Sequence, residues 1–187
     1  LRAALDGQGQ VHASVASYNN HWGVPLTLAR MPVDTDFGVI EIGMSAPGEI
    51  EPLARLARPD VAIVTTIAAA HLEAFDDLAG IAREKGSIFN GLESGGIAIV
   101  NGDLDETPIL LEMAGTHDTR TFGMSEPCDI RAEMVELLHD RSVVEAQLQS
   151  GKRLFRVAAP GRHMVSNALA VLGVAEALEL ELDIATA

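Results

Sequence analysis

The amino-acid sequence predicts an α/β fold with a mostly parallel, Rossmann-like or P-loop-type sheet flanked by helices, and a small antiparallel subsheet near residues 119–158. Two observations predict it. In the first part of the chain, apolar β-branched runs alternate with segments of helical apolar spacing, which is the pattern of parallel strands joined by helices. After residue 119, short strands follow one another with tight turns, which indicates antiparallel pairing.

The expected parallel strands are short and rich in β-branched residues. The clearest is Val61 to Ile67, whose largely apolar character is typical of a strand buried on both faces. Pro59 and the Gly95-Gly96 pair mark helix boundaries, and Leu1 to Leu5 fits the end of a further helix. Strands are expected at residues 11–15, 37–43, 61–67 and 97–100, and helices at residues 21–31, 49–57, 78–90 and 106–114.

The last third of the chain combines short strands with one long helix. Strands are expected at residues 120–122, 130–137, 142–149 and 154–157, and the turn Ser150-Gly151-Lys152 joins the last two. From His163 to Leu180 the apolar residues return to helical spacing, so this segment is expected to pack against the sheet. Its expected core positions are Ala168, Leu169, Leu172, Ala175, Ala177 and Leu178.

Composition limits the classes of partner. A chain of 187 residues is long enough for one domain with a substantial core, and nothing in the sequence requires a second. The net charge of −14 argues against nucleic acids and acidic membranes as partners. Cys128 is the single cysteine, and no apolar run approaches the roughly 20 residues that span a bilayer, so a reducing cytoplasm is the expected location.

The segment from Val61 to Phe89 carries the most suggestive chemistry. It places His71, Glu73 and Lys85 around one strand-to-helix turn, and open α/β sheets bind ligands at the carboxyl ends of their strands. Lys85 is also one of only two lysines, against eleven arginines. Each residue taken alone has a structural explanation, since a histidine often caps a strand and a lysine often ends a solvated helix.

This segment and four other blocks resemble the ATP-dependent Mur ligases of peptidoglycan synthesis. SYNNHWGVPLTLARMP looks like the family's NN-x-x-GVPLTL block, and FGVIEIGMSAPGEIEPL looks like its strand ending in E-x-G before GEI. VNGDLDE is similar to the family's N-x-D-x segment, and PGRHMVSNALAVLGVA to PGRHN-x-x-NALAA. The five blocks follow the family order over nearly the whole chain. The resemblance is closest to the MurF type within the family.

The resemblance implies an enzyme that uses ATP and Mg²⁺ to phosphorylate a substrate carboxylate, after which an amine displaces the phosphate. The substrates implied for the whole enzyme are UDP-N-acetylmuramoyl-tripeptide and D-alanyl-D-alanine. Glu41 and His71 match the magnesium-coordinating positions of the family, and Lys85 matches a lysine that is carbamylated in many members to support a second magnesium ion. The alternatives are a strand-end charge pair for Glu41, and for Lys85 a surface pair with Glu84 or an aspartate.

Further contacts are implied at both ends of the chain. Asn19 and Asn20 match a pair that shapes the substrate side of the cleft, although Asn20 also has the position of a helix N-cap. Asn167 matches an asparagine that contacts adenine, and an amide side chain can form two hydrogen bonds with the N6 and N7 edge of adenine. The alternative is that Asn167 caps the preceding loop. Asn101 and His163, in the last two blocks, are expected to join it in binding the nucleotide.

The sequence contains no P-loop. Neither lysine fits G-x-x-x-x-G-K-[ST], because Lys85 precedes Gly86 and Lys152 precedes Arg153. In the family this loop lies just before the helix that corresponds to Leu1 to Leu5. Since the chain also begins without Met and stops before the family's C-terminal domain, residues 1–187 are expected to be the central ATPase-type domain of a longer enzyme, inactive alone.

Five residues near the expected cleft depart from the family pattern. They are Ser17, Ser45, Ala46, Ser87 and Met164. These departures keep open a second interpretation, a noncatalytic or repurposed Mur-like domain that binds a nucleotide or a partner. Folylpolyglutamate synthetase and other Mur ligases are alternatives within the enzyme class, but GVPLTL followed by AHLE favours the MurF type.

Overall fold

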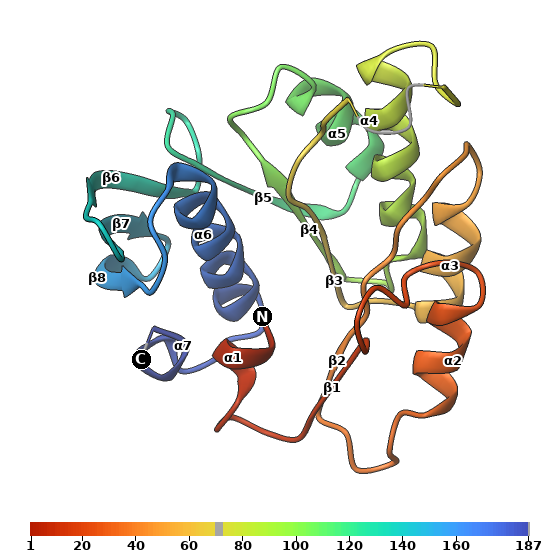
Figure 1. The fold of residues 1–187 in the computed structure, drawn as a ribbon, viewed down its shortest axis with the longest axis horizontal. Coiled ribbons are helices and arrows are strands. Elements are labelled where there is room, and N and C mark those ends of the chain that lie inside the picture. The colour runs from red at the N-terminus through yellow and green to blue at the C-terminus, as the bar shows by residue number, and fades with distance from the viewer. Residues whose placement is uncertain (70–72, 187) are drawn as a thin grey trace.

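Residues 1–69 and 73–186 are described by the computed structural model, whose strands and helices form an α/β fold (Figure 1). The larger sheet has the strand order β3-β4-β5-β6-β7-β8. Its first four strands are parallel and its last two continue antiparallel. The strands are β3 (Val61–Val64), β4 (Ile97–Asn101), β5 (Asp118–Gly123), β6 (Ile130–Leu137), β7 (Ser142–Leu148) and β8 (Gly151–Val157). The predicted fold class is confirmed.

The first two strands form a separate parallel pair. β1 (Val11–Ala13) bonds β2 (Phe37–Val39), and within the described residues neither strand is hydrogen-bonded to β3. Both are shorter than the expected strands at 11–15 and 37–43, because their pairing ends after three residues. Glu41 therefore lies in the loop beyond β2 and not within a strand.

The antiparallel part is smaller than expected. The segment 120–122 belongs to β5, which pairs in parallel with both β4 and β6. β5 and β6 overlap only where Phe122 meets Ile130 and Gly123 meets Arg131, so the end of one strand lies beside the start of the next. This small overlap lets a short link join two parallel strands that would otherwise need a long crossover. Antiparallel pairing begins between β6 and β7.

Helices cover both faces of the parallel strands. Figure 1 shows α2, α3, α4 and α5 along one side and α6 on the other, with α1 and α7 near the end of α6. The expected helix 78–90 divides into α4 and a 3₁₀ turn, η1 (Ser87–Gly91). No helix within the described ranges has the length and hydrophobicity needed to cross a bilayer. The helices are α1 (Arg2–Leu5), α2 (Gly23–Ala29), α3 (Ile50–Ala57), α4 (Leu78–Gly86), α5 (Thr107–Ala114), α6 (Arg162–Ala177) and α7 (Leu182–Ala185).

Two hydrophobic clusters fix the helices to the sheet. Val64 and Val100 pack with Phe89 on the face covered by α4 and α5. Ile99, next to Val100 on β4, points to the opposite face and packs with Leu169 of α6. Burying one such side chain contributes about 1.5–3 kcal/mol, so these contacts hold the strand ends in place for the loops that follow.

Candidate active site

Glu41 is oriented by a side chain from the neighbouring loop. Asn19 Nδ2 donates a 2.8 Å hydrogen bond to Glu41 Oε1, and the Asn19 carbonyl accepts one from Gly43 N at 2.8 Å. The Glu41 N–H also donates to Ser14 Oγ at 3.2 Å. A Cβ at Gly43 would lie 2.8 Å from Asn19 Nδ2, so a larger residue there would displace the Asn19 side chain from this position. The carboxylate of Glu41 is held on one oxygen and remains exposed to a ligand.

Asn20 caps helix α2. Its Oδ1 accepts hydrogen bonds from Trp22 N at 3.1 Å and from Gly23 N at 3.0 Å, which would lack partners at the start of a helix. The structure therefore supports the capping interpretation of Asn20, and its contact with a substrate stays a prediction.

A pocket of about 270 Å³ lies beside the Asn19–Glu41 pair. It opens between the start of α2, the loop after β2 and the start of α3. Its lining residues are Asn20, His21, Gly43, Gly48, Glu49, Pro52 and Leu53. Its polar lining side chains are those of Asn20, His21 and Glu49.

Lys85 points from α4 toward the end of β3. Its Nζ donates a 2.8 Å hydrogen bond to the carbonyl of Thr66, two residues beyond β3, and burial lowers the pKa of Lys85. The preceding residue, Glu84, bonds the start of α3 through Gly48, Glu49 and Ile50. The alternative in which Lys85 pairs with Glu84 on the helix surface is therefore wrong.

Asn101 joins the ends of two strands. It is buried at the end of β4, where Nδ2 donates to the carbonyl of Thr65 at 2.7 Å and Oδ1 accepts from Asp103 N at 2.9 Å. Asp103 in turn accepts from Met124 N and Ser125 N, after β5. Because both ends of the Asn101 amide bond the backbone, this geometry favours positioning of the strand ends over direct contact with a nucleotide.

His163 and Asn167 lie together at the start of α6. They are four residues apart, so they share one exposed side of the helix. Gly161, just before the helix, has φ +117°, and a Cβ there would lie 2.8 Å from the His163 ring. Both residues belong to α6, which lies across the parallel strands from α4, the helix that carries Lys85 (Figure 1).

The predicted magnesium ligands are only partly placed. His71 lies outside the described residues, so its approach to Glu41 stays a prediction. Within residues 1–69 and 73–186, no three His, Cys, Asp or Glu side chains gather as a metal site. Magnesium does not require such a cluster, because one or two carboxylates commonly bind it together with water and substrate phosphates. The exposed, oriented carboxylate of Glu41 fits that kind of site.

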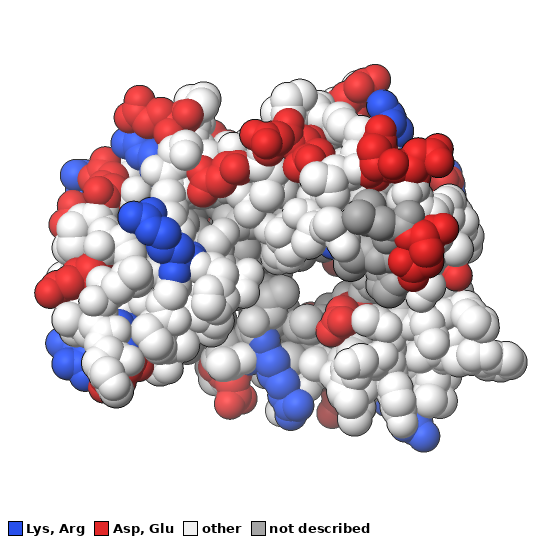
Figure 2. Space-filling view, turned by 45° about the horizontal axis from the view of Figure 1, so that its top comes forward, with Lys and Arg blue, Asp and Glu red and all other residues white. Residues whose placement is uncertain are grey.

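One rim of the molecule is largely acidic. Figure 2 shows acidic side chains along the upper rim of the molecule, above a hollow in the middle of this face. Such a rim repels a polyphosphate. A nucleotide that binds here needs a divalent cation or backbone N–H groups to offset the repulsion.

The structure has two sheets with parallel strands, with an oriented carboxylate beyond β2 and a half-buried lysine beside the end of β3. It is an α/β domain of the class that commonly binds ligands at the carboxyl ends of its strands. The family described as the Mur ligase middle domain matches residues 1–175. The chain belongs to this family.

The relatives and solved structures agree with this membership. The chain is 36% identical over 172 residues to the UDP-N-acetylmuramoyl-tripeptide–D-alanyl-D-alanine ligase of Bacillus subtilis, covering 92% of this chain and 36% of that ligase. A crystal structure of MurF from Acinetobacter baumannii has a TM-score of 0.94 at 30% identity, covering 98% of this chain and 40% of that one. MurF from Thermotoga maritima in complex with ADP shares the fold, with a TM-score of 0.86 at 24% identity over 99% of this chain and 44% of that one. The chain thus spans well under half the length of these proteins.

One residue that the sequence did not single out, Glu84, bonds the loop before α3. Sequence reasoning considered Glu84 only as a partner for Lys85. Its actual partners are 34 to 36 positions away, so no local spacing signals the contact. The only hint in the sequence is helical spacing: Glu84 lies three residues after Ile81 and four before Ile88, so it shares their apolar side of the helix.

Proposed function

We propose that this chain is the central ATP-binding domain of a ligase that adds D-alanyl-D-alanine to UDP-N-acetylmuramoyl-tripeptide in peptidoglycan synthesis. The observation that carries the proposal is the Asn19–Glu41 pair, an exposed carboxylate held in a fixed direction beside the strand ends. The substrates are those named for the similar ligase of Bacillus subtilis. The proposal includes a cytoplasmic location, where ATP is available.

In the proposed reaction, ATP phosphorylates the terminal carboxylate of the tripeptide, and the amine of D-alanyl-D-alanine then displaces phosphate from the acyl phosphate. Mg²⁺, when bound, would neutralise charge on the phosphates. Glu41 would supply an oxygen ligand, Asn19 would keep that carboxylate in place, and His71 is the proposed second ligand.

Lys85 is proposed to act as a carbamate. Burial lowers the pKa of Lys85, which raises the fraction of neutral amine that carbon dioxide attacks. Its Nζ bonds the Thr66 carbonyl just beyond β3, so the modified group would lie at the carboxyl edge of the sheet. Carbamylation would replace a cation there with an anion that can support a metal ion.

The remaining predicted residues divide between the two ends of the ligand. Asn167 and His163, exposed together on α6, are proposed to contact the adenine. Asn101 is proposed to act in nucleotide binding through its hold on the strand ends. Asn20 borders the pocket, which is proposed to receive part of a peptide substrate.

The full-length protein that contains this chain tests the proposal. Formation of UDP-N-acetylmuramoyl-pentapeptide, followed by mass spectrometry, is expected only when ATP, Mg²⁺ and D-alanyl-D-alanine are all present, with one phosphate released for each amide formed. L-alanyl-L-alanine is the matched control acceptor. Nucleotide binding with no product would instead support the repurposed domain that the departures at Ser45, Ala46 and Met164 suggest.

A further inference from the structure

Glu84 is a buried carboxylate that reaches across to a different helix. It is 9% exposed, the only charged side chain counted as buried among the described residues. Its Oε2 accepts a hydrogen bond from Gly48 N at 2.7 Å, and its Oε1 accepts from Glu49 N at 3.0 Å and Ile50 N at 2.9 Å. These three N–H groups stand at the start of α3.

The contact replaces the local cap that most helices use. The first N–H groups of a helix lack partners within it, and a negative charge there is favourable, especially through charge-assisted hydrogen bonds. Glu49, at the N-cap position of α3, makes no cap bond; its carboxylate accepts from Ser45 N at 2.7 Å and Ala46 N at 3.3 Å. Two carboxylates thus hold the loop before α3, and Glu84 ties that loop to α4.

This tie joins two parts of the fold that share no strand pairing. β1 and β2, whose following loops carry Asn19 and Glu41, are not hydrogen-bonded to β3 within the described part of the chain. Glu84 connects the loop after β2 to α4, and the next residue, Lys85, connects α4 to Thr66 after β3. Successive residues of an α-helix point about 100° apart, so Glu84 and Lys85 can reach the loop after β2 and the loop after β3, respectively.

We propose that Glu84 is a positioning residue that fixes the loop carrying Glu41 at a set place relative to Lys85. The inference rests on the proposed function, which assigns Glu41 and Lys85 to one site. Side chains that act on one ligand must be held to within about 0.5 Å of their working positions. The residues that hold these side chains in place are therefore as necessary as the side chains themselves. Both carboxylate oxygens of Glu84 already accept backbone N–H groups, so Glu84 acts through the loop.

The test compares Glu84→Gln with Glu51→Gln in the full-length protein. Glutamine keeps the size of Glu84 and an oxygen for two of the three bonds, but loses the charge and sets an NH₂ donor against Gly48 N. Glu51 provides a matched control, because it is an exposed carboxylate in the first turn of α3 and bonds Arg55 at 2.8 Å. Thermal melting establishes that each variant is folded.

Amide hydrogen exchange, followed by mass spectrometry without nucleotide, gives the first readout. In Glu84→Gln, exchange is expected to speed up about tenfold or more at residues 48–50 and also at residues 40–43, which carry Glu41. In Glu51→Gln both segments should exchange as in the wild type. Faster exchange confined to residues 48–50, or no change at all, would overturn the proposal, because Glu84 would then be a local cap or no support.

The second readout is the magnesium dependence of ligation. Glu84→Gln is expected to raise the Mg²⁺ concentration for half-maximal rate several-fold, whereas a loss of folded protein alone lowers the rate without moving that concentration. An unchanged magnesium dependence overturns the positioning role. If the wild-type protein forms no product, the proposed function has failed, and the exchange at residues 40–43 still decides whether Glu84 holds the loop.

Discussion

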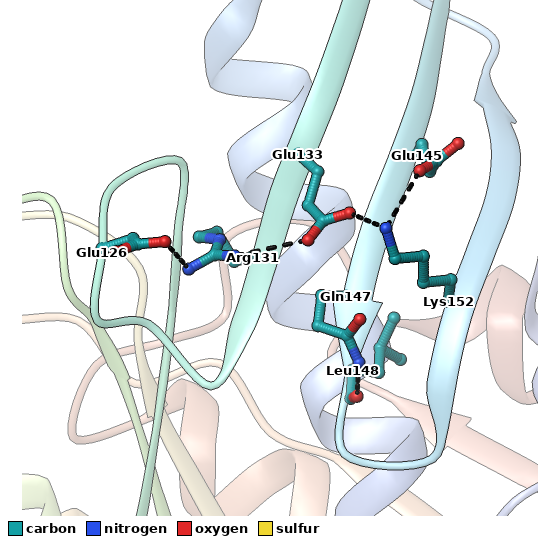
Figure 3. A network of polar contacts seen from close by, with 7 residues as sticks. All are labelled: Glu126, Arg131, Glu133, Glu145, Gln147, Leu148 and Lys152. Atoms are coloured by element: carbon teal, nitrogen blue, oxygen red, sulfur yellow. Dashed lines mark hydrogen bonds and ion pairs between the residues drawn. The ribbon is translucent and has the colours of Figure 1, made fainter.

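Two regions of the molecule hold their charged side chains in different ways. Around α4, the buried Glu84 and the half-buried Lys85 bond backbone groups of neighbouring loops. On the face of β6, β7 and β8, charged side chains bond one another at the surface (Figure 3). The first arrangement fixes the direction of each charged side chain, whereas the surface pairs do not require a fixed direction.

The surface network runs across three strands. Arg131 of β6 bonds Glu126 at 2.7 Å and Glu133 at 3.3 Å, and Lys152 of β8 bonds Glu133 at 2.5 Å and Glu145 of β7 at 3.6 Å (Figure 3). The hydrogen bond to Glu133 raises the pKa of Lys152, and the same bond lowers the pKa of Glu133. Water and salt screen such exposed pairs, so they add little stability.

The comparison separates the two lysines of the chain. Burial lowers the pKa of Lys85, and an ion pair raises the pKa of Lys152. A lowered pKa makes an amine more nucleophilic near neutral pH, whereas a raised one keeps it protonated. Of the two lysines, Lys85 therefore has the larger fraction of neutral amine near neutral pH, which is the form that carbon dioxide attacks.

The largest expected effect is that of Glu41→Ala on catalysis by the full-length enzyme. The rate should fall by about 10²–10³, the usual cost of one transition-state contact at developing charge, while binding of the UDP-linked tripeptide stays near the wild-type value. Steady-state kinetics at limiting Mg²⁺ measure the rate. Glu145→Ala, in the surface network, is the matched control and should keep full activity. A wild-type rate for Glu41→Ala would remove Glu41 from the site.

Lys85→Ala is expected to lower the rate by roughly tenfold or more, since one polar contact typically supplies at least that factor. Added acetate should restore part of the rate, because its carboxylate can occupy the place of the carbamate. Lys85→Arg should stay inactive with or without acetate, since its guanidinium fills the space with a positive charge. Full activity of Lys85→Arg would show that a cation suffices and would end the carbamate proposal.

In the 187-residue chain, the modification itself can be observed by ¹³C NMR with labelled bicarbonate, because Lys152 is the only other lysine of this chain and provides an internal control. The label should appear on Lys85 and vanish in Lys85→Ala. Raising the pH should increase the amount of label on Lys85.

The pKa of Lys85 is lower in the folded chain than in the unfolded one, so the unfolded chain binds more protons at pH values between the two pKa values. The free energy of unfolding therefore rises with pH in that range.

Glu84→Ala is expected to destabilise the 187-residue chain by about 1–3 kcal/mol, because three N–H groups at the start of α3 lose their acceptor. Urea unfolding, monitored by circular dichroism, measures the loss. An unchanged unfolding midpoint would mean that water replaces the carboxylate without cost.

The smallest expected effect is that of Lys152→Ala in the surface network. Its urea midpoint should match the wild type within error at physiological salt, because the partners of Lys152 are exposed. Any small shift should disappear in 1 M salt, where surface charges are screened. A midpoint shift as large as that of Glu84→Ala would contradict the contrast between the two regions.

Most of the fold follows from periodicity, and most of the site geometry does not. The apolar run that begins at Val61 predicted a strand, because burial on both faces requires apolar residues throughout. The helical spacing after Leu78 predicted a helix, because burial on one face places apolar residues three or four positions apart. The strand after Phe37 is shorter than its apolar run, since pairing requires a partner as well as composition. The contact of Asn19 with Glu41 joins residues 22 positions apart, and nothing in local sequence encodes such a distance.

Some functional predictions depended on residue identity alone. Asn20 had two interpretations from sequence, and its bonds to Trp22 and Gly23 support the capping one. Asn101 matched a family block, but its amide bonds the backbone on both sides. The sequence does not reveal whether a polar side chain near a ligand site touches the ligand or supports the loop. Only the structure distinguishes the two roles.

The separation of the two sheets bears on how the isolated chain behaves in solution. Among the described residues, β3 has a neighbour along one edge only, and this strand is the apolar Val61–Val64. A strand edge without a hydrogen-bonded neighbour can pair with the same edge of another molecule, which leads to aggregation. The net charge of −14 opposes that encounter by mutual repulsion. Concentrating the chain near its isoelectric point would remove that protection.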